Sequence, residues 1–248
     1  MTGKPKLMVV ADADAVGRAA ADVVTETVRR KPDAAIAAPT GSTPLPMFAQ
    51  LIARVGRGGL DLSRVHLFCL DEYVGVATSD PVSLTGWLSR MFFTPAGIPE
   101  RQVHTLPSMD SEPEPALRRY ETDLAARGGL ELAVLGLGGN GHIAYNEPGS
   151  AADSRTRVLT LTPESVTRAA GYFAGRTVPT RAMTIGVGTL LEARMIALIV
   201  TGTAKAAILR RTLSEPMTAD VPASWLRLAG DRLTAIADEA AFGQMARG

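Results

Sequence analysis

Short and almost continuous apolar runs punctuate the chain, for example at residues 34–39, 65–70 and 130–137. A strand that is buried on both faces has this pattern, whereas a half-exposed strand alternates apolar and polar residues. Between the runs, apolar residues recur every three or four positions, as at Val16 and Ala20, which is typical of amphipathic helices. This alternation predicts an α/β fold, a three-layer sandwich with a mostly parallel, Rossmann-like central sheet.

The chain has 248 residues and contains no internal repeat, low-complexity tract or long linker, so we expect a single domain over residues 1–248. Its formal net charge is +1 and its basic residues are scattered, which argues against a nucleic-acid partner. No stretch approaches the roughly 20 apolar residues of a membrane span. The single cysteine, Cys69, excludes an intrachain disulfide and is expected to be a buried, inert thiol. These features predict a cytoplasmic protein without a nucleic-acid or membrane partner.

Polar loops follow several of the apolar runs, where ligands bind in open α/β folds. The first loop carries Thr40, Gly41 and Ser42, and Thr43 and Pro44 then read as an N-cap followed by proline at the first helical position. Backbone N–H groups and hydroxyls at a helix N-terminus form an anion site, and phosphate is the usual anion. The alternative is a plain capped turn without a ligand.

The second loop contains an acidic pair, Asp71 and Glu72, directly after an apolar run. Adjacent side chains at a strand end point to opposite sides, so only one of them can face a given cleft. A carboxylate that is partly shielded from water there is a candidate general base. The alternative use of the pair is to cap a helix or a turn.

The third loop, "LGLGGNGHIAYNEPGS", places His142 and Glu147 five residues apart. A helical zinc site wants two histidines four residues apart, and this chain has three histidines in all, so we expect no metal. A carboxylate near a histidine can instead fix its tautomer and stabilise its charged form. The glycines of the loop, beginning with Gly136, let the backbone approach a ligand closely, and we take Gly136 as substrate-binding.

Several of these segments together resemble the glucosamine-6-phosphate deaminase (isomerase) family, which belongs to a superfamily that also holds 6-phosphogluconolactonases. The segments are "PTGSTP", "LDEYVG", "GLGGNGHIAYNEPGS", "SRTRVLTLT" and "TIGVGTLLEA", and the likeness runs over residues 7–240. "DEYVG" and "GHIAYNEP" are specific to the deaminase branch. The resemblance implies an enzyme that isomerises and deaminates glucosamine 6-phosphate to fructose 6-phosphate and ammonia, without a metal or an organic cofactor.

The resemblance also implies roles for the residues of the second and third loops. Asp71 would move a proton between C2 and C1 of the sugar. His142 would handle the protons of ring opening, with Glu147 orienting and polarising it. Asn140 stands where many members carry aspartate; it can orient His142 but cannot compensate its charge.

For the substrate phosphate, the resemblance implies the loop of Thr40, Gly41 and Ser42 together with Lys205, which follows a late apolar run. The family often adds an arginine at the position that Gly171 occupies here, and Arg168, one turn earlier on the same helix face, is a candidate replacement.

Regulated members of the family carry a lysine two residues after the second arginine of "SRTR", whereas this chain has Leu159 there. We therefore expect no activation by an N-acetylated sugar phosphate at that position, and we expect Arg157 to be a structural or a vestigial cation. Family members differ in oligomeric state, so a homo-oligomer stays open.

Two other functions stay open besides the deaminase. A lactonase-type hydrolase would use the same scaffold, with the histidine activating water and Asp71 dispensable for proton transfer. A non-catalytic sugar-phosphate sensor would bind the ligand without turnover, and the departures at Asn140 and Gly171 keep that function open.

Overall fold

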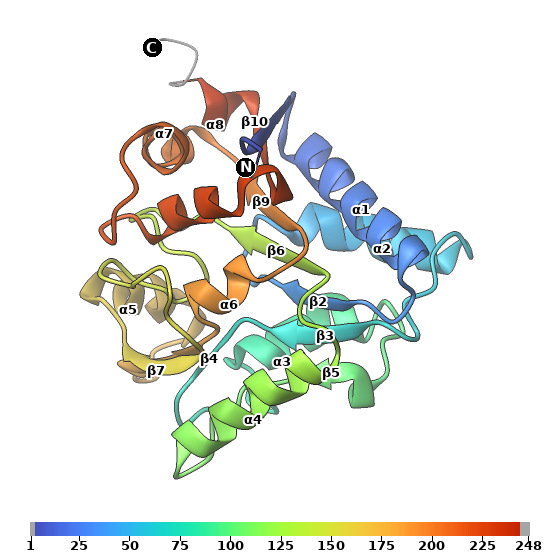
Figure 1. Cartoon of the computed structure of the whole chain (residues 1–248). Coiled ribbons are helices and arrows are strands. Elements are labelled where there is room, and N and C mark those ends of the chain that lie inside the picture. Colours follow the sequence, from blue (N-terminus) through green and yellow to red (C-terminus); the bar gives the residue numbers. More distant parts are fainter. Residues whose placement is uncertain (1–2, 244–248) are drawn as a thin grey trace.

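The computed structural model describes residues 3–243, and its centre is a seven-stranded sheet (Figure 1). The strand order is β1-β10-β9-β6-β2-β3-β5, and every neighbouring pair is parallel. The strands are β1 (Lys6–Val10), β2 (Ala35–Ala38), β3 (His66–Cys69), β5 (Val103–His104), β6 (Leu132–Gly136), β9 (Ile196–Val200) and β10 (Leu233–Asp238). The predicted α/β fold with a parallel central sheet is confirmed. The single domain over residues 1–248 stays a prediction, and residues 1–2 and 244–248 lie outside the described residues.

Helices cover both faces of this sheet and make two separate cores (Figure 1). One core contains side chains of α1 (Ala13–Arg30), α2 (Leu45–Gly56), α3 (Leu84–Leu88) and the π-helical turn η1 (Ser89–Phe93). The other contains side chains of α4 (Pro113–Ala126), α6 (Val187–Leu191), α7 (Ala206–Ser214), α8 (Glu239–Phe242) and the 3-10 segment η5 (Pro222–Arg232). Alternate residues of one strand enter opposite cores, which explains the continuous apolar runs.

A second, three-stranded sheet was not predicted from the sequence. Its strands β4 (Asp71–Tyr73), β8 (Arg181–Thr184) and β7 (Arg157–Thr160) are antiparallel, in the order β4-β8-β7. It forms a third apolar cluster with side chains of α5 (Pro163–Ala169), and the 3-10 turn η3 (Ala170–Tyr172) follows that helix. Short 3-10 turns also occur at η2 (Glu100–Gln102) and η4 (Thr203–Lys205). The sheet lies beyond the carboxyl end of β3, so Asp71 belongs to a strand and not to a loop.

The start of α2 differs from the expected cap. Pro44, not Thr43, is the N-cap residue, it has helical backbone angles, and no side chain caps the helix there. The backbone makes the turn by itself, because the Leu45 N–H donates to the Ser42 carbonyl at 3.2 Å. The hydroxyls of the loop before α2 are therefore not consumed by helix capping.

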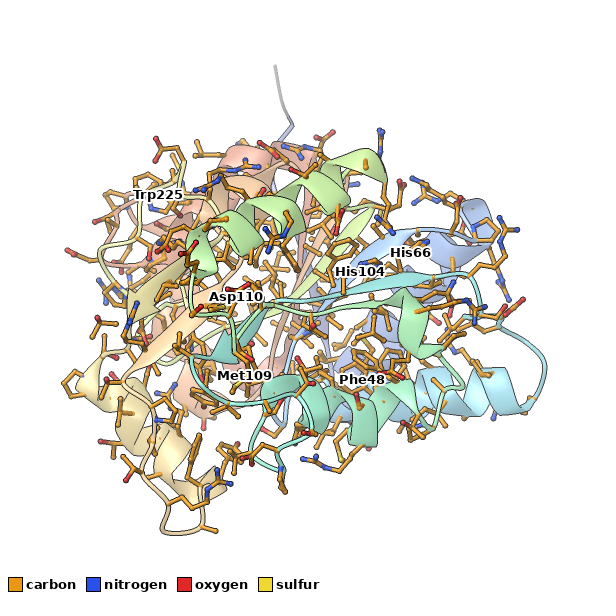
Figure 2. The ribbon with its side chains drawn as sticks, turned by 90° about the horizontal axis from the view of Figure 1, so that it is seen from below. Phe48, His66, His104, Met109, Asp110 and Trp225 are labelled. Carbon is orange, nitrogen blue, oxygen red and sulfur yellow. The ribbon has the colours of Figure 1, made fainter. Side chains whose placement is uncertain are left out.

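The other two histidines of the chain contact each other on the central sheet. His66 and His104 lie side by side on β3 and β5 (Figure 2), with His66 Nδ1 3.0 Å from His104 Nε2.

Cys69 is fully buried, as predicted, and burial raises the pKa of its thiol to about 12. Among residues 3–243, no helix has both the length and the apolar character to cross a membrane.

We expect the contact between α1 and α2 to tolerate no side chain at Gly17. A Cβ built on Gly17 would lie 2.4 Å from Pro46 Cβ and 2.8 Å from the Pro46 carbonyl carbon. Gly17→Ala should therefore lower the free energy of unfolding by roughly 1–3 kcal/mol, measured by urea denaturation. Gly56→Ala is the matched control, because open space surrounds that position, and it should stabilise the protein by up to about 1 kcal/mol. Equal effects of the two changes would contradict this packing.

Candidate active site

A cavity of about 410 Å³ opens beyond the carboxyl ends of β2 and β6, a volume within the range of small-molecule sites. Its wall consists of the loops after β2 and β6, the strand β4, the segment of residues 81–90 that contains α3, and the helix α5 with the turn after it. Six of its lining residues carry the chemistry discussed below, namely Thr40, Gly41, Tyr73, His142, Tyr145 and Arg168. Of the nine site residues proposed from the sequence, Thr40, Gly41 and His142 line this cavity.

His142 forms a compact group with Glu147 and Asn140. Its Nδ1 lies 3.6 Å from Glu147 Oε2, an ion-pair distance that is longer than a hydrogen bond. The Asn140 side-chain amide donates to the same carboxylate oxygen at 3.0 Å. Asn140 Oδ1 accepts a hydrogen bond from the backbone N–H of His142 at 3.2 Å, so Asn140 contacts the main chain of His142 and not its ring. The group therefore holds one carboxylate oxygen against the imidazole.

Glu147 is buried, yet its carboxylate stays charged. Burial raises its pKa, but the His142 ring, the Ser165 hydroxyl and the Asn140 amide outweigh that effect and hold the pKa at about 2. An ionised carboxylate beside His142 stabilises the protonated imidazole, which is what a histidine that gains and loses a proton during a reaction requires.

The close packing around His142 requires glycine at two positions. A Cβ on Gly138 would lie 2.3 Å from His142 Cδ2, so any other residue would displace the ring. Gly141 has φ +90°, a left-handed conformation, and a Cβ there would meet Val221 at 2.8 Å. These two glycines place the imidazole, while the sequence had suggested only that the glycines admit a ligand.

The acidic pair on β4 separates into two different environments. Glu72 is fully buried and accepts hydrogen bonds from the backbone N–H groups of Tyr73, Leu84 and Thr85. The Ser83 hydroxyl donates to it at 2.6 Å. Glu72 therefore caps the start of α3, which is the capping role that the sequence left open, and Asp71 is left as the candidate base.

Asp71 is 8% exposed and lies beside the aromatic wall of the cavity. Burial, and then the charge of Glu72, raises the pKa of Asp71 to about 7. Burial is the main cause that raises the pKa of Tyr73 and of Tyr145, which line the cavity, and the charge of Asp71 raises both further. Among the residues described, Asp71 itself is not part of the lining, whereas Tyr73, two residues later on the same strand, is.

The lining also includes a polar turn and a cation. Gly41 has φ +97°, so the loop after β2 can turn its backbone toward a ligand, and Ser42 beside it is exposed. Arg168 lines the cavity and is held by Glu164 at 2.6 Å. Burial, and then the charge of Arg168, lowers the pKa of Lys205, which places the two cations near each other.

Gly136, the last residue of β6, and Arg157, the first residue of β7, lie on either side of the loop that carries His142 and Glu147 in the sequence. A Cβ built on Gly136 would meet nothing within 4 Å, so there is free space beside this glycine. Arg157 donates to Asn146 Oδ1 at 2.9 Å and to Ser150 Oγ at 2.8 Å, and so braces the segment that carries Glu147. This geometry agrees with a structural role for Arg157.

Tyr73 and Tyr145 were not predicted as site residues, although both lie inside the motifs "DEYVG" and "GHIAYNEP". Their hydroxyls meet at 2.6 Å across the cavity wall. No spacing rule joins residues that are 72 positions apart. The signal available in the sequence was a tyrosine close to each catalytic candidate, Asp71 and His142.

The raised pKa of Asp71 predicts how stability depends on pH. The folded protein holds this proton more tightly than the unfolded chain does, so the stabilisation is present below about pH 4 and is lost as the pH rises through about 7. The side chain in Asp71→Asn cannot ionise. As the pH rises from about 4 through about 7, the free energy of unfolding of this variant should therefore increase relative to that of the wild type by roughly 2–4 kcal/mol. Urea denaturation at pH 4 to 8 measures the difference.

Asp61 supplies a control of opposite sign for that experiment. Its pKa is lowered by a hydrogen bond from the Ser63 backbone, and the side chain is exposed. Asp61→Asn should therefore lose stability relative to the wild type as the pH rises towards about 4, which urea denaturation at lower pH would measure, and the difference should stay constant between pH 4 and 8. A flat difference for Asp71→Asn would mean that Asp71 is not shielded from water.

Comparisons with known proteins agree with this geometry. A family model described as glucosamine-6-phosphate isomerases/6-phosphogluconolactonase matches residues 10–235. Glucosamine-6-phosphate deaminase of Streptomyces coelicolor is 38% identical over 242 residues, which cover 97% of this chain and 92% of that protein. The deaminase of Rhodopirellula baltica is 37% identical over 237 residues, which cover 95% and 94%.

Solved structures give the same result. A monomeric glucosamine-6-phosphate deaminase superposes with a TM-score of 0.92 and 32% identity, over 96% of this chain and 99% of that one. A 6-phosphogluconolactonase from Trypanosoma cruzi superposes with a TM-score of 0.79 at 20% identity, over 99% of this chain and 98% of that one, which shows the shared fold alone. The chain belongs to the glucosamine-6-phosphate isomerase/6-phosphogluconolactonase family.

Proposed function

We propose that this protein isomerises and deaminates glucosamine 6-phosphate, giving fructose 6-phosphate and ammonia. The observation that carries the proposal is that His142, backed by an ionised Glu147, lines the same cavity as the Thr40–Gly41 turn and Arg168. That arrangement offers a proton carrier at one end and an anion site at the other. The identity to deaminases over nearly the whole chain supports the same conclusion.

The reaction begins with opening of the sugar ring. His142 takes the proton of the C1 hydroxyl and returns a proton to the ring oxygen as the C1–O5 bond breaks, which leaves an open-chain aldehyde. The charged Glu147, 3.6 Å from the ring nitrogen, stabilises the imidazolium that forms in between. Asn140 keeps Glu147 in place through its amide.

Asp71 carries the isomerisation. As a carboxylate it removes the proton from C2, and as the acid it delivers a proton to C1. The C1 aldehyde oxygen takes a proton from the C2 ammonium group, so the aldose becomes a protonated ketose imine. A pKa of about 7 suits both halves of this cycle, because the group is readily ionised and readily protonated at neutral pH. Water then adds to the imine carbon at C2, and ammonia leaves to give the ketose.

The phosphate binds at the opposite end of the cavity. The backbone at Gly41 and the hydroxyls of Thr40 and Ser42 supply hydrogen-bond donors, and Lys205 supplies charge. Arg168 takes the place of the arginine missing at Gly171, since it lines the cavity from the same helical segment and lies near Lys205. Gly136 admits the sugar backbone through the free space beside it.

The direct test is to incubate the protein with glucosamine 6-phosphate and to measure ammonia and fructose 6-phosphate. Both products should appear in equal amounts. Asp71→Asn should reduce turnover by at least about 100-fold, because general acid–base catalysis contributes that much. A lactonase-type hydrolase would instead hydrolyse 6-phosphogluconolactone and would be little affected by Asp71→Asn. Binding of the sugar phosphate without any product would identify a sensor.

The phosphate site predicts a different kinetic signature for Arg168. Arg168→Ala should raise KM by roughly 10-fold or more and change kcat little, because a charge-assisted contact to the phosphate is lost from substrate and transition state alike. Inorganic phosphate should also inhibit the variant more weakly than it inhibits the wild type.

Glu164→Gln is the matched control for this prediction. It removes the ion-pair partner of Arg168 and keeps the guanidinium, so the change in KM should be small. An unchanged KM for Arg168→Ala would exclude Arg168 from the phosphate site.

A further inference from the structure

We propose that the hydroxyls of Tyr73 and Tyr145 form a specificity element that binds one unreacting ring hydroxyl of the sugar and so selects among epimers of the substrate. This inference rests on the proposed function and adds a determinant of substrate choice within the same cavity.

The direction of the hydrogen bond leaves one donor unused. Tyr145 donates to the Tyr73 oxygen at 2.6 Å, a short bond for two hydroxyls. The Tyr73 O–H is then left with its own proton, and among the described residues no acceptor for it is recorded. A buried hydroxyl normally donates to a partner. Tyr73 is 2% exposed and its side chain lines the cavity, so a ligand in the cavity is the available acceptor.

The pair joins the two catalytic segments. Tyr73 belongs to β4, two residues after Asp71, and Tyr145 belongs to the loop that carries His142 and Glu147. The backbone N–H of Tyr145 donates to Thr184 Oγ1 at 3.0 Å, and Thr184 is the cross-strand partner of Asp71. The Tyr73 ring also packs edge-on against Phe173 at 5.1 Å, and this contact holds the Tyr73 ring in place.

The backbone before Tyr145 is strained, which is a separate sign of function. Ala144 has φ +50°, a left-handed conformation that costs a non-glycine residue roughly 1–3 kcal/mol. This conformation turns the chain between Ile143, which is fully buried, and Tyr145, which faces the cavity. The fold thus accepts a cost at the residue that directs the Tyr145 ring to the cavity.

The chemistry of the pair matches a hydroxyl group. Tyr73 offers a proton, and Tyr145, having donated its own, offers oxygen lone pairs. A sugar hydroxyl both donates and accepts, so it can bond to both oxygens at once, whereas a phosphate can only accept. C1 and C2 react beside His142 and Asp71, and the phosphate on C6 lies at the Thr40–Gly41 end. The hydroxyls left for the pair are therefore those on C3 and C4.

The test is a comparison of three substrates in Tyr145→Phe and Tyr73→Phe. Glucosamine 6-phosphate is compared with its C3 epimer and its C4 epimer, as substrates or as competitive inhibitors. Loss of one uncharged hydrogen bond should lower kcat/KM for glucosamine 6-phosphate by roughly 3–10-fold. The epimer whose hydroxyl misses the pair has nothing to lose, so the discrimination against it should shrink by the same factor. A uniform change for all three compounds would overturn the inference.

Tyr120→Phe separates this effect from a loss of stability. Tyr120 is another buried tyrosine, and its hydroxyl donates to the Cys69 carbonyl at 2.9 Å without lining the cavity. Its removal should lower the unfolding midpoint and leave the ratios between epimers unchanged. A change in the ratios for Tyr120→Phe equal to that for Tyr145→Phe would assign the effect to packing and overturn the inference.

The failure of the proposed function would look different from the failure of this inference. If the wild type releases no ammonia from any of the three compounds, the proposed function fails. The pair is then tested by calorimetric binding of the same three compounds, with inorganic phosphate as the reference. Tyr145→Phe should reduce the preference among the sugars and leave phosphate binding as it was, and an unaltered preference would overturn the inference.

Discussion

The parallel direction of all seven central strands is the constraint on which the site depends. Parallel strands end at one edge of their sheet, so the chain that leaves β2, β3, β6 and β9 emerges on the same side. Segments that carry Thr40, His142 and Lys205 are far apart in sequence and meet there for this reason alone. Covering both faces with helices is what makes a parallel sheet stable, and it keeps water from the strands that hold these loops.

Two neighbouring carboxylates show how the local environment assigns a role. Glu72 points into a nest of four donors and caps α3, whereas Asp71 is buried beside the cavity and has its pKa raised to about 7. Glu147 has its pKa lowered to about 2 by the groups around it. The chain therefore keeps one acid that readily exchanges its proton and one that stays charged, which are the two properties that the proposed proton transfer and ring opening require.

The fold could be predicted from the sequence because apolar runs and helical periodicity report burial directly. The second sheet could not, because β4 reads DEY, and nothing in that polar triplet indicates that it pairs with β8. The glycine-rich loop was recognisable, yet the reason for Gly138 is the His142 ring above it, a contact that only the folded turn creates. The cap of α2 was misplaced by one residue, since Thr43-Pro44 fits a cap by composition while the Ser42–Leu45 turn closes through the backbone.

The contact between Tyr73 and Tyr145 could not be predicted from the motifs, because it too is created only by the folded chain. A motif marks residues that stand together in the chain, and Tyr73 and Tyr145 meet only because β4 pairs with β8 while Thr184 on β8 holds the Tyr145 backbone. The second sheet thus brings the two tyrosines of the cavity wall together, as the central sheet brings the polar loops together. The specificity that we propose for this pair therefore depends on the pairing of β4 with β8, in the antiparallel sheet and outside the parallel one.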